Sequence, residues 1–373
     1  MKTLDAELLN ELTSHSAETS LSIYLPLHKS VSESSMDFLA FKNLIKDIRS
    51  GADAKHRKAL EDLLIPVENF LESKDFVRGS AGALAIFSAP KIFEIVMLTE
   101  ATEAAFYVDE CFYLLPLLEL AADNKPFQVL ALGKNHVHLF EGDRYRFEEI
   151  NLDDRIPSNM KEALGYDLTD NHLHAAAGGS AAIHGYMEIT DEKETDNTRF
   201  FRIIDQEINE KYSKQNKVPL ILAALPENES LFQSISKNEC LEKQFISLNA
   251  DRIDKQLLHS RALEILDAKK ADALDKQLER FSGAKSEDLA TDEIADIARH
   301  AMDSRIERLF ITKGQKLRGT VSIEDRKIET DEESNSDIIN KIALLTYKNG
   351  GHIHTLHTNN KKLPAGIGSI NRF

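Results

Sequence analysis

The sequence has few of the features that mark specialised classes of protein. Its 373 residues include only two cysteines, nine prolines and 16 glycines, and no apolar run approaches the roughly 20 residues that span a bilayer. Cys111 and Cys240 lie far apart and lack metal-type spacing. We therefore expect two buried thiols in a reducing compartment, without a disulfide framework. The chain also contains no internal repeat and no low-complexity tract.

The N-terminus lacks the pattern of a secretory signal. Residues 1–12, MKTLDAELLNEL, carry acids where a signal would have a basic region followed by an apolar stretch. Together with the missing apolar runs, this predicts a cytoplasmic protein with no membrane partner.

Positive charge is in short supply. The chain has 46 Lys and Arg against 62 Asp and Glu, for a formal net charge of −16. Such a balance opposes non-specific attraction to a polyanion and gives no reason to expect DNA as a partner. Because charges are largely screened beyond about 8 Å, a local basic patch can still contact RNA.

An ordinary composition and considerable length predict a globular protein of two or three domains, since 42% of the residues are hydrophobic. In residues 1–125, Leu21–Leu27 is typical of a strand closed by Pro26, and Ser34–Phe70 has helical spacing. Ala83–Ser88 and Phe93–Leu98 then predict a hairpin. These elements indicate an N-terminal α/β domain.

Residues 126–250 predict a second α/β domain. Three β-type runs between Phe127 and Leu152 are separated by Gly133–Asn135 and Glu141–Asp143, so an antiparallel meander is expected. Arg199–Tyr212 has one apolar helical face, and Pro219–Leu225 is a continuous apolar run typical of a strand covered on both faces.

The remainder divides into a helical linker, 251–285, and a C-terminal α/β domain, 286–373. Ser282–Ser286 is expected to break the linker helix. The last domain repeats helix and strand, with helices at Asp292–Met302 and Asp337–Lys348 and strands at Arg308–Thr312 and His352–Leu356. Between them lies an acidic loop, Thr330–Asp337, in which Ser336 or Asn335 is expected to cap the second helix.

Residues 165–198 have little apolar periodicity, and we predict a long loop. Structureless loops longer than about 12–15 residues in compact domains are usually functional or disordered. Gly178 and Gly179 allow backbone conformations closed to other residues, as a loop tip presented to a partner requires. His172, His174 and His184 are nearby candidates for acid–base chemistry, metal binding or stacking on RNA.

Three interpretations of this loop stay open. A metal site would use those three histidines, but their spacing matches no strong site and no fixed carboxylate is evident, so neither a metal nor another cofactor is predicted. A nucleophile at Ser180 would lie in a pattern one residue short of a nucleophile elbow, without the strand that precedes such an elbow. The third is a loop that faces a ribosome or tRNA. The C-terminal histidines, His352, His354 and His357, are expected to be ordinary strand or edge residues.

Several stretches, in order, resemble the bacterial members of the archaeo-eukaryotic release factor family, relatives of Pelota, including their family-three-like sequences. The similarity covers essentially the whole chain. The stretches are Leu21–Ser30, Lys74–Glu100, Phe127–Ile150, Arg199–Ile208, Asp303–Thr312 and the ending KNGGHIHTL…AGIGSINRF.

This resemblance implies an α/β protein of three domains. The first would sit where relatives recognise the decoding site. The middle one would be ribonuclease-H-like, with a long protruding loop that reaches the peptidyl-transferase centre in true release factors. The last would be a ribosomal-protein-like α/β domain that contacts partner proteins, a translational GTPase among them.

True release factors carry Gly-Gly-Gln at the loop tip, which places water against the peptidyl-tRNA ester. Here the resemblance aligns Gly178-Gly179-Ser180 with that triplet. A side chain about two carbons shorter reaches the same point only if the backbone moves inward by roughly 2–3 Å, and misplacement of about 1 Å already costs around 10²-fold in rate. His184-Gly185 resembles a His-Gly element common in the bacterial family.

Two functions follow as hypotheses. The first is a ribosome-associated factor in rescue, stalling response or hibernation that enters the tRNA site without efficient peptidyl release; its contacts would be Gly178, Gly179, Ser180, His184 and Gly185. The alternative is a hydrolase of peptidyl-tRNA or another ester. In that enzyme His184 would be the general base, and Ser180 or an activated water the nucleophile.

Overall fold

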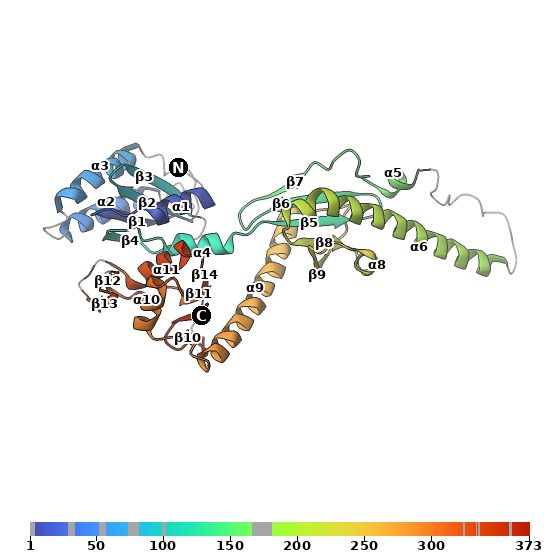
Figure 1. Cartoon of the computed structure of the whole chain (residues 1–373). Coiled ribbons are helices and arrows are strands. Elements are labelled where there is room, and N and C mark those ends of the chain that lie inside the picture. The colour runs from blue at the N-terminus through green and yellow to red at the C-terminus, as the bar shows by residue number, and fades with distance from the viewer. Residues whose placement is uncertain are drawn as a thin grey trace. The chain divides into compact units, whose positions relative to one another are not determined.

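A computed structural model describes residues 4–28, 34–51, 57–73, 82–98, 102–165, 181–323, 325–332, 334, 336–357 and 360–373, without the side chains of 34–35 and 181–194. The chain forms two compact units (Figure 1). The first combines Met1–Asp123 with Leu274–Phe373, and the second is Asn124–Ala273. Both are mixed α/β structures, which confirms the predicted class. None of the described helices is long and apolar enough to cross a membrane.

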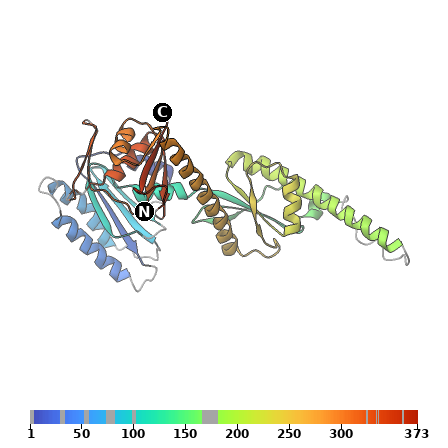
Figure 2. The same cartoon turned by 90° about the horizontal axis from the view of Figure 1, so that it is seen from below.

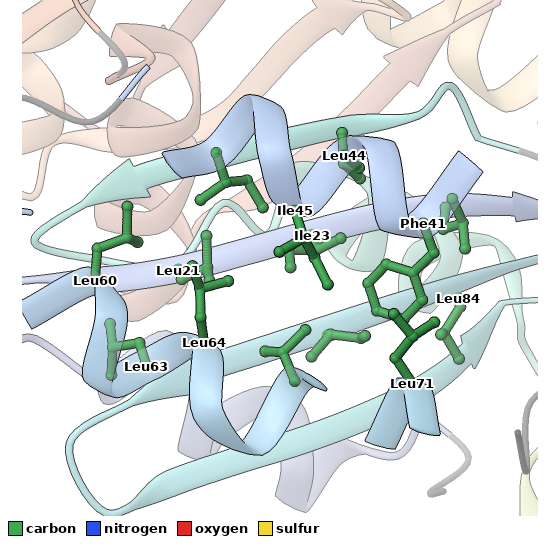
Figure 3. Packing of buried hydrophobic residues seen from close by; sticks show 14 of the residues in the cluster. Leu21, Ile23, Phe41, Leu44, Ile45, Leu60, Leu63, Leu64, Leu71 and Leu84 are labelled. Atoms are coloured by element: carbon green, nitrogen blue, oxygen red, sulfur yellow. The ribbon is translucent and has the colours of Figure 1, made fainter. Parts of the chain in front are cut away.

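The N-terminal part of the first unit is built on an antiparallel sheet of order β3-β2-β1-β4. Its strands are β1 (Ser20–Leu27), β2 (Gly82–Ala89), β3 (Ile92–Leu98) and β4 (Ala105–Asp109). Helices α2 (Ser34–Ser50) and α3 (Arg57–Ser73) cover one face, and their leucines, isoleucines and Phe41 interlock with Leu21 and Ile23 (Figure 3). The helical spacing of apolar residues in Ser34–Phe70 is therefore explained by their burial in this core.

Two local predictions in this sheet need adjustment. Pro26 does not close β1, because the strand continues to Leu27 and Pro26 pairs with Ala83. Its missing N–H is tolerated because β4 pairs with β1 only as far as Tyr24. The predicted hairpin is confirmed, with a tighter turn of Pro90 and Lys91 in which Lys91 has φ +71°.

The opposite face of this sheet receives residues 112–114. Tyr24 donates its hydroxyl hydrogen to the carbonyl of Tyr113, and Tyr113 donates its N–H to Ser22. Helices α1 (Ala6–Ser14) and α4 (Leu115–Asp123) lie on either side of this segment in sequence. Cys111 is half-buried rather than buried, and burial raises its thiol pKa to about 12. Cys240, in the second unit, is also half-buried.

The C-terminal part of the first unit has a sheet of order β10-β15-β11-β14. Figure 2 shows the strands of this part in red-brown near the C-terminus. Only β11 (Ile306–Thr312) and β14 (His352–Leu356) run parallel, while β15 (Ile367–Asn371) is antiparallel to β11. The other elements are β10 (Ala290–Thr291), α10 (Ile294–Met302), α11 (Ile338–Lys348) and a hairpin of β12 (Gly319–Ser322) and β13 (Lys327–Thr330). The predicted helices and strands are confirmed, and four strands, β10, β12, β13 and β15, were not predicted.

Two predicted helix boundaries were wrong. Asp337, not Ser336 or Asn335, caps α11, because its carboxylate accepts the N–H groups of Ile339 and Asn340. Helix α9 (Lys255–Lys285) runs through the predicted break at Ser282. Tertiary packing overrides local propensity there, since Leu278 and Phe281 are fully buried against Phe310 and its neighbours.

The second unit contains a five-stranded sheet of order β7-β6-β5-β8-β9. The predicted meander is confirmed as β5 (Phe127–Leu132), β6 (Val137–Gly142) and β7 (Phe147–Ile150), all antiparallel. β8 (Leu220–Ala224) and β9 (Leu241–Ser247) run parallel to β5. At Gly142 a Cβ would lie 2.2 Å from the Arg146 carbonyl oxygen, so the second turn requires glycine.

Helices cover both faces of this sheet. On one face, α6 (Ala181–Ile208) and α8 (Pro226–Ile235) bury Phe200, Phe201 and Phe232. On the other, α9 buries Leu258 and Ala262. This double cover explains why β8 is a continuous apolar run, as expected for a strand with no solvent face.

The predicted loop at 165–198 is helical over its second part. Helix α6 begins at Ala181, and residues 166–180 lie outside the described residues. Apolar periodicity indicates a buried face, not helicity as such, so a helical stretch without an apolar stripe escapes that criterion. Residues 181–198 contain several Ala, Glu and Lys, which are good helix formers.

Candidate functional site

Helix α6 is held to the second unit by its C-terminal half. Phe200, Phe201, Ile204 and Ile208 recur at helical spacing and are fully buried against the sheet. In Figure 1 the N-terminal half of the helix extends beyond the edge of that sheet. Helix α6 is therefore fixed at its buried C-terminal half; we call this helix, residues 181–208, the arm.

A buried carboxylate ties the base of the arm to α8. Asp205 is only 7% exposed and accepts the hydroxyl hydrogen of Ser236 and the backbone N–H of Lys237. Ser236 is the C-cap residue of α8. Hydrogen bonds from a neutral hydroxyl and an amide compensate the desolvation of this carboxylate, so the two helices are fixed relative to each other.

Beyond Ile208 the backbone widens into a π-helical turn, η4 (Asn209–Ser213), followed by the short helix α7 (Lys214–Asn216). Lys211 in this turn forms ion pairs with Asp153 at 2.9 Å and with Glu207 at 3.0 Å. Hydrogen bonds from Arg155 and then Lys211 lower the pKa of Asp153 well below its usual range. The end of the arm is thus fastened to the loop that follows β7.

Of the sequence-predicted site residues, only His184 and Gly185 lie in the described part of the chain. His172, His174, Gly178, Gly179 and Ser180 lie outside the described residues. His184 and Gly185 lie in the first turns of α6. The structure therefore does not test whether His184 and Ser180 lie close together, and the roles predicted for them stay predictions.

No group of three or more metal-ligating side chains occurs among the described residues. The C-terminal histidines have structural contacts: the His354 ring stacks on Phe310 at 5.4 Å, and its Nε2 lies 3.2 Å from Nη1 of Arg308. His352 is exposed on the same strand, β14, which is an edge of its sheet.

A shallow groove in the second unit, about 480 Å³, is lined by Lys243, Gln244 and Phe245 of β9 and by Glu264, Ile265 and Ala268 of α9. It holds one carboxylate and no histidine, cysteine or serine. The lining has no hydroxyl, thiol or imidazole group, so the serine and histidine chemistry predicted for an ester hydrolase has no counterpart in this groove.

The arm and its anchoring sheet fall inside a segment that a family model recognises. Residues 126–305 match bacterial archaeo-eukaryotic release factor family 3. This match confirms the resemblance predicted from the sequence. The family-3 segment contains the whole five-stranded sheet, the arm, helix α9 and the beginning of the C-terminal part.

Solved structures of translation factors also align with the chain. The archaeal translation termination factor aRF1 is 14% identical, with 100% of this chain and 99% of that one covered and a TM-score of 0.24. Archaeoglobus fulgidus Pelota is 11% identical, with 78% and 79% covered and a TM-score of 0.35. S. cerevisiae Dom34, described as a translation termination-like factor that interacts with Hbs1, is 11% identical, with 78% and 73% covered and a TM-score of 0.36. TM-scores below 0.5 do not establish a shared overall fold. No curated protein matches the sequence.

Proposed function

We propose that the chain is a release-factor-like protein that associates with the ribosome in rescue, stalling response or hibernation, without efficient peptidyl release. The observation that carries this proposal is the family-3 match, which covers the arm and the domain that anchors it. The proposed lack of efficient peptidyl release is supported by the sequence Gly178-Gly179-Ser180, because Ser180 stands where the family's release factors have the longer glutamine.

The finer architecture belongs to the same proposal. The second unit would be the ribonuclease-H-like domain that the resemblance implies, and residues 286–373 the ribosomal-protein-like domain that contacts a translational GTPase. A mixed sheet covered by helices on both faces supports the first assignment, and the α/β character of the C-terminal part supports the second. Domain boundaries at 125, 250 and 285 remain predictions. A cytoplasmic location, with tRNA-site RNA as partner and no DNA, is part of the proposal.

The anchored helix supports a positioning role for the arm. Four buried apolar side chains and the Asp205 hydrogen bonds hold the base of α6, so the helix would present its N-terminal end from a fixed platform. In catalysis by positioned water, the precision of placement decides the rate. The shorter side chain of Ser180 would not reach the point where glutamine places the attacking water. We therefore propose ribosome binding rather than peptidyl release.

Co-sedimentation tests the proposal. Tagged protein is expected to pellet with ribosomes, and Ser180→Ala and His184→Ala are expected to pellet equally well. Peptidyl release by the wild type should stay at the background rate in a reaction with ribosomes that carry peptidyl-tRNA. Absence of ribosome association, together with ester hydrolysis that both substitutions abolish, would instead establish the hydrolase.

A gain-of-function variant sharpens the test. Ser180→Gln restores Gly-Gly-Gln without changing charge, and we expect release to rise above the wild-type rate by up to about 10²-fold. Ser180→Asn is the matched control, because its amide is one methylene shorter. Wild-type release as fast as that of Ser180→Gln would contradict the proposed lack of efficient release.

A further inference from the structure

Two loops of the C-terminal part begin at the same edge of its sheet. β11 and β14 are parallel neighbours in register, and Thr312 pairs with Leu356 at their carboxyl ends. Lys313 donates its N–H to the Leu356 carbonyl at 2.8 Å, and Thr312 donates to the Gly366 carbonyl at 2.7 Å. The loop after β11 and the loop after β14 are therefore held side by side. In open α/β sheets the carboxyl end of parallel strands is where ligands usually bind.

These two loops are free of acidic residues in a strongly acidic chain. No Asp or Glu occurs from Arg308 to Ile323 or from Ile338 to Phe373, although the chain contains 62. Besides Arg318, whose guanidinium donates to the Glu332 carbonyl at 3.0 Å, the loops carry five exposed basic or imidazole side chains: Lys313, Lys316, His357, Lys361 and Lys362. We call these five residues the basic edge.

Carboxylates from other elements lie near the basic edge, and Asp331 of the acidic segment 330–337 donates its backbone N–H to the Arg318 carbonyl at the end of the first loop. Glu279 of α9 pairs with Lys362 at 3.4 Å, in an ion pair that is 70% exposed on the Glu279 side. Exposed pairs of this kind contribute little and exchange readily. Asp337 lies near Lys316 but is buried, and desolvation raises its carboxyl pKa. The described residues of the two loops thus carry cationic side chains and contribute no carboxylate of their own.

The composition of the basic edge distinguishes between kinds of partner. The cores of protein–protein interfaces are enriched in aromatic residues and arginine and depleted in lysine. Here the cations other than Arg318 are lysines, and their polar neighbours are Gln315 and Asn360. Lysine binds phosphate as a point charge without geometric selection. The loops themselves contain no Phe, Tyr or Trp, and the Tyr107 ring that lies 5.8 Å from Nζ of Lys316 is already stacked on Tyr113.

We propose that the basic edge binds the phosphate backbone of a nucleic acid without reading its sequence. The proposal goes beyond the proposed function, because this surface lies outside the arm and its binding requires no ribosome. Each lysine that contacts a phosphate releases condensed counterions, so affinity should fall steeply with salt. The net charge of −16 opposes binding elsewhere on the chain and directs the phosphates to this edge.

Fluorescence anisotropy of the full chain with a labelled RNA hairpin, and with a DNA hairpin of the same sequence, tests the proposal between about 50 and 200 mM salt. The triple variant Lys313→Gln, Lys361→Gln, Lys362→Gln should bind about tenfold or more weakly and lower the salt slope by about 2–3. The control triple Lys42→Gln, Lys46→Gln, Lys58→Gln removes the same charge from exposed positions of α2 and α3. It should bind like the wild type.

Binding of the RNA hairpin with this dependence supports the proposal, and tighter binding of the DNA hairpin would contradict the proposed absence of a DNA partner. Equal losses in the two triple variants, or no hairpin binding by the wild type, would overturn it. Preferential binding of a poly-glutamate peptide through the same lysines would replace it with an acidic protein partner. If the triple variant fails to fold, Lys361→Gln alone should still reduce the slope by about 0.7–0.9. Ribosome co-sedimentation of the triple variant separates the failure of this proposal from failure of the proposed function.

Discussion

Asn340 joins the two ends of the sequence within the first unit. It is 2% exposed on α11, and its amide oxygen accepts the backbone N–H groups of Leu114 and Leu115 at 2.8 and 3.2 Å. Its amide nitrogen donates to the carbonyl of Phe112 at 3.1 Å. A side chain from the C-terminal part thus satisfies backbone groups at the start of α4, where a helix has no partners of its own.

We expect Asn340→Ala to lower the free energy of unfolding by about 2–4 kcal/mol, because three buried backbone groups lose their partner. Urea denaturation measures the change. The control is Asn216→Ala, at an exposed position of α7, which should change stability by less than about 0.5 kcal/mol. A change at Asn340 as small as the control would show that water replaces the amide.

The neighbouring residue Lys341 forms an ion pair with Asp109 at 3.1 Å, and the two side chains are only 15% and 9% exposed. Tyr347 adds a hydrogen bond to Asn10. These polar contacts lie on α11 beside Asn340 in sequence, so one helix carries several of the links between segments more than 200 residues apart. Sequence spacing gave no indication of them, because each is an unremarkable polar residue on an amphipathic helix.

Among the elements, α6 combines a buried half with a half that carries no apolar stripe. Asp205 connects the buried half to α8. Removal of its carboxylate leaves the Ser236 hydroxyl and the Lys237 N–H without their acceptor, at a cost of about 1–3 kcal/mol.

We therefore expect Asp205→Ala to increase hydrogen exchange in α6 residues 199–208 and in the end of α8. Exchange mass spectrometry of the full chain resolves both segments. The adjacent Gln206→Ala is the control, since Gln206 is exposed and makes only a 3.5 Å contact with Glu210. Protection equal in both variants would mean that the apolar contacts alone fix the helix.

For the whole molecule, the division into two units predicts how it unfolds. Phe41 on α2 and Phe281 on α9 belong to different hydrophobic clusters of the first unit, whereas Phe200 on α6 belongs to a cluster of the second unit. We expect Phe41→Ala and Phe281→Ala to destabilise the same unfolding transition, and Phe200→Ala to destabilise another. Each substitution should cost about 3–5 kcal/mol.

Guanidinium denaturation followed by pulse hydrogen exchange measures these transitions in the intact chain. Conservative Phe→Leu variants at the three positions are matched controls, with smaller effects in the same order. If Phe41→Ala and Phe281→Ala destabilise separate transitions, the N-terminal and C-terminal parts unfold independently. That result would contradict the prediction that the first unit unfolds as a whole.

The sequence by itself determined the class of fold and most elements with a clear period. The meander, the Pro90 hairpin, β8 and the helix–strand alternation at the end are local patterns of burial that chain spacing records directly. It also carried the family resemblance, which residues 126–305 confirm. The sequence fell short where no apolar stripe was present, as in residues 181–198, and where packing overrode a local signal, as at Ser282.

Only the tertiary structure decided which distant residues meet. The capping of α4 by Asn340, the bond from Asp205 to α8, and the meeting of Lys313 with Leu356 depend on contacts across the chain. The acid-free composition of the C-terminal 36 residues was present in the sequence, but its meaning depends on two loops lying at one sheet edge. Local propensity acts over a few residues, whereas these arrangements arise from the packing of whole helices and sheets, and so they cannot be read from spacing alone.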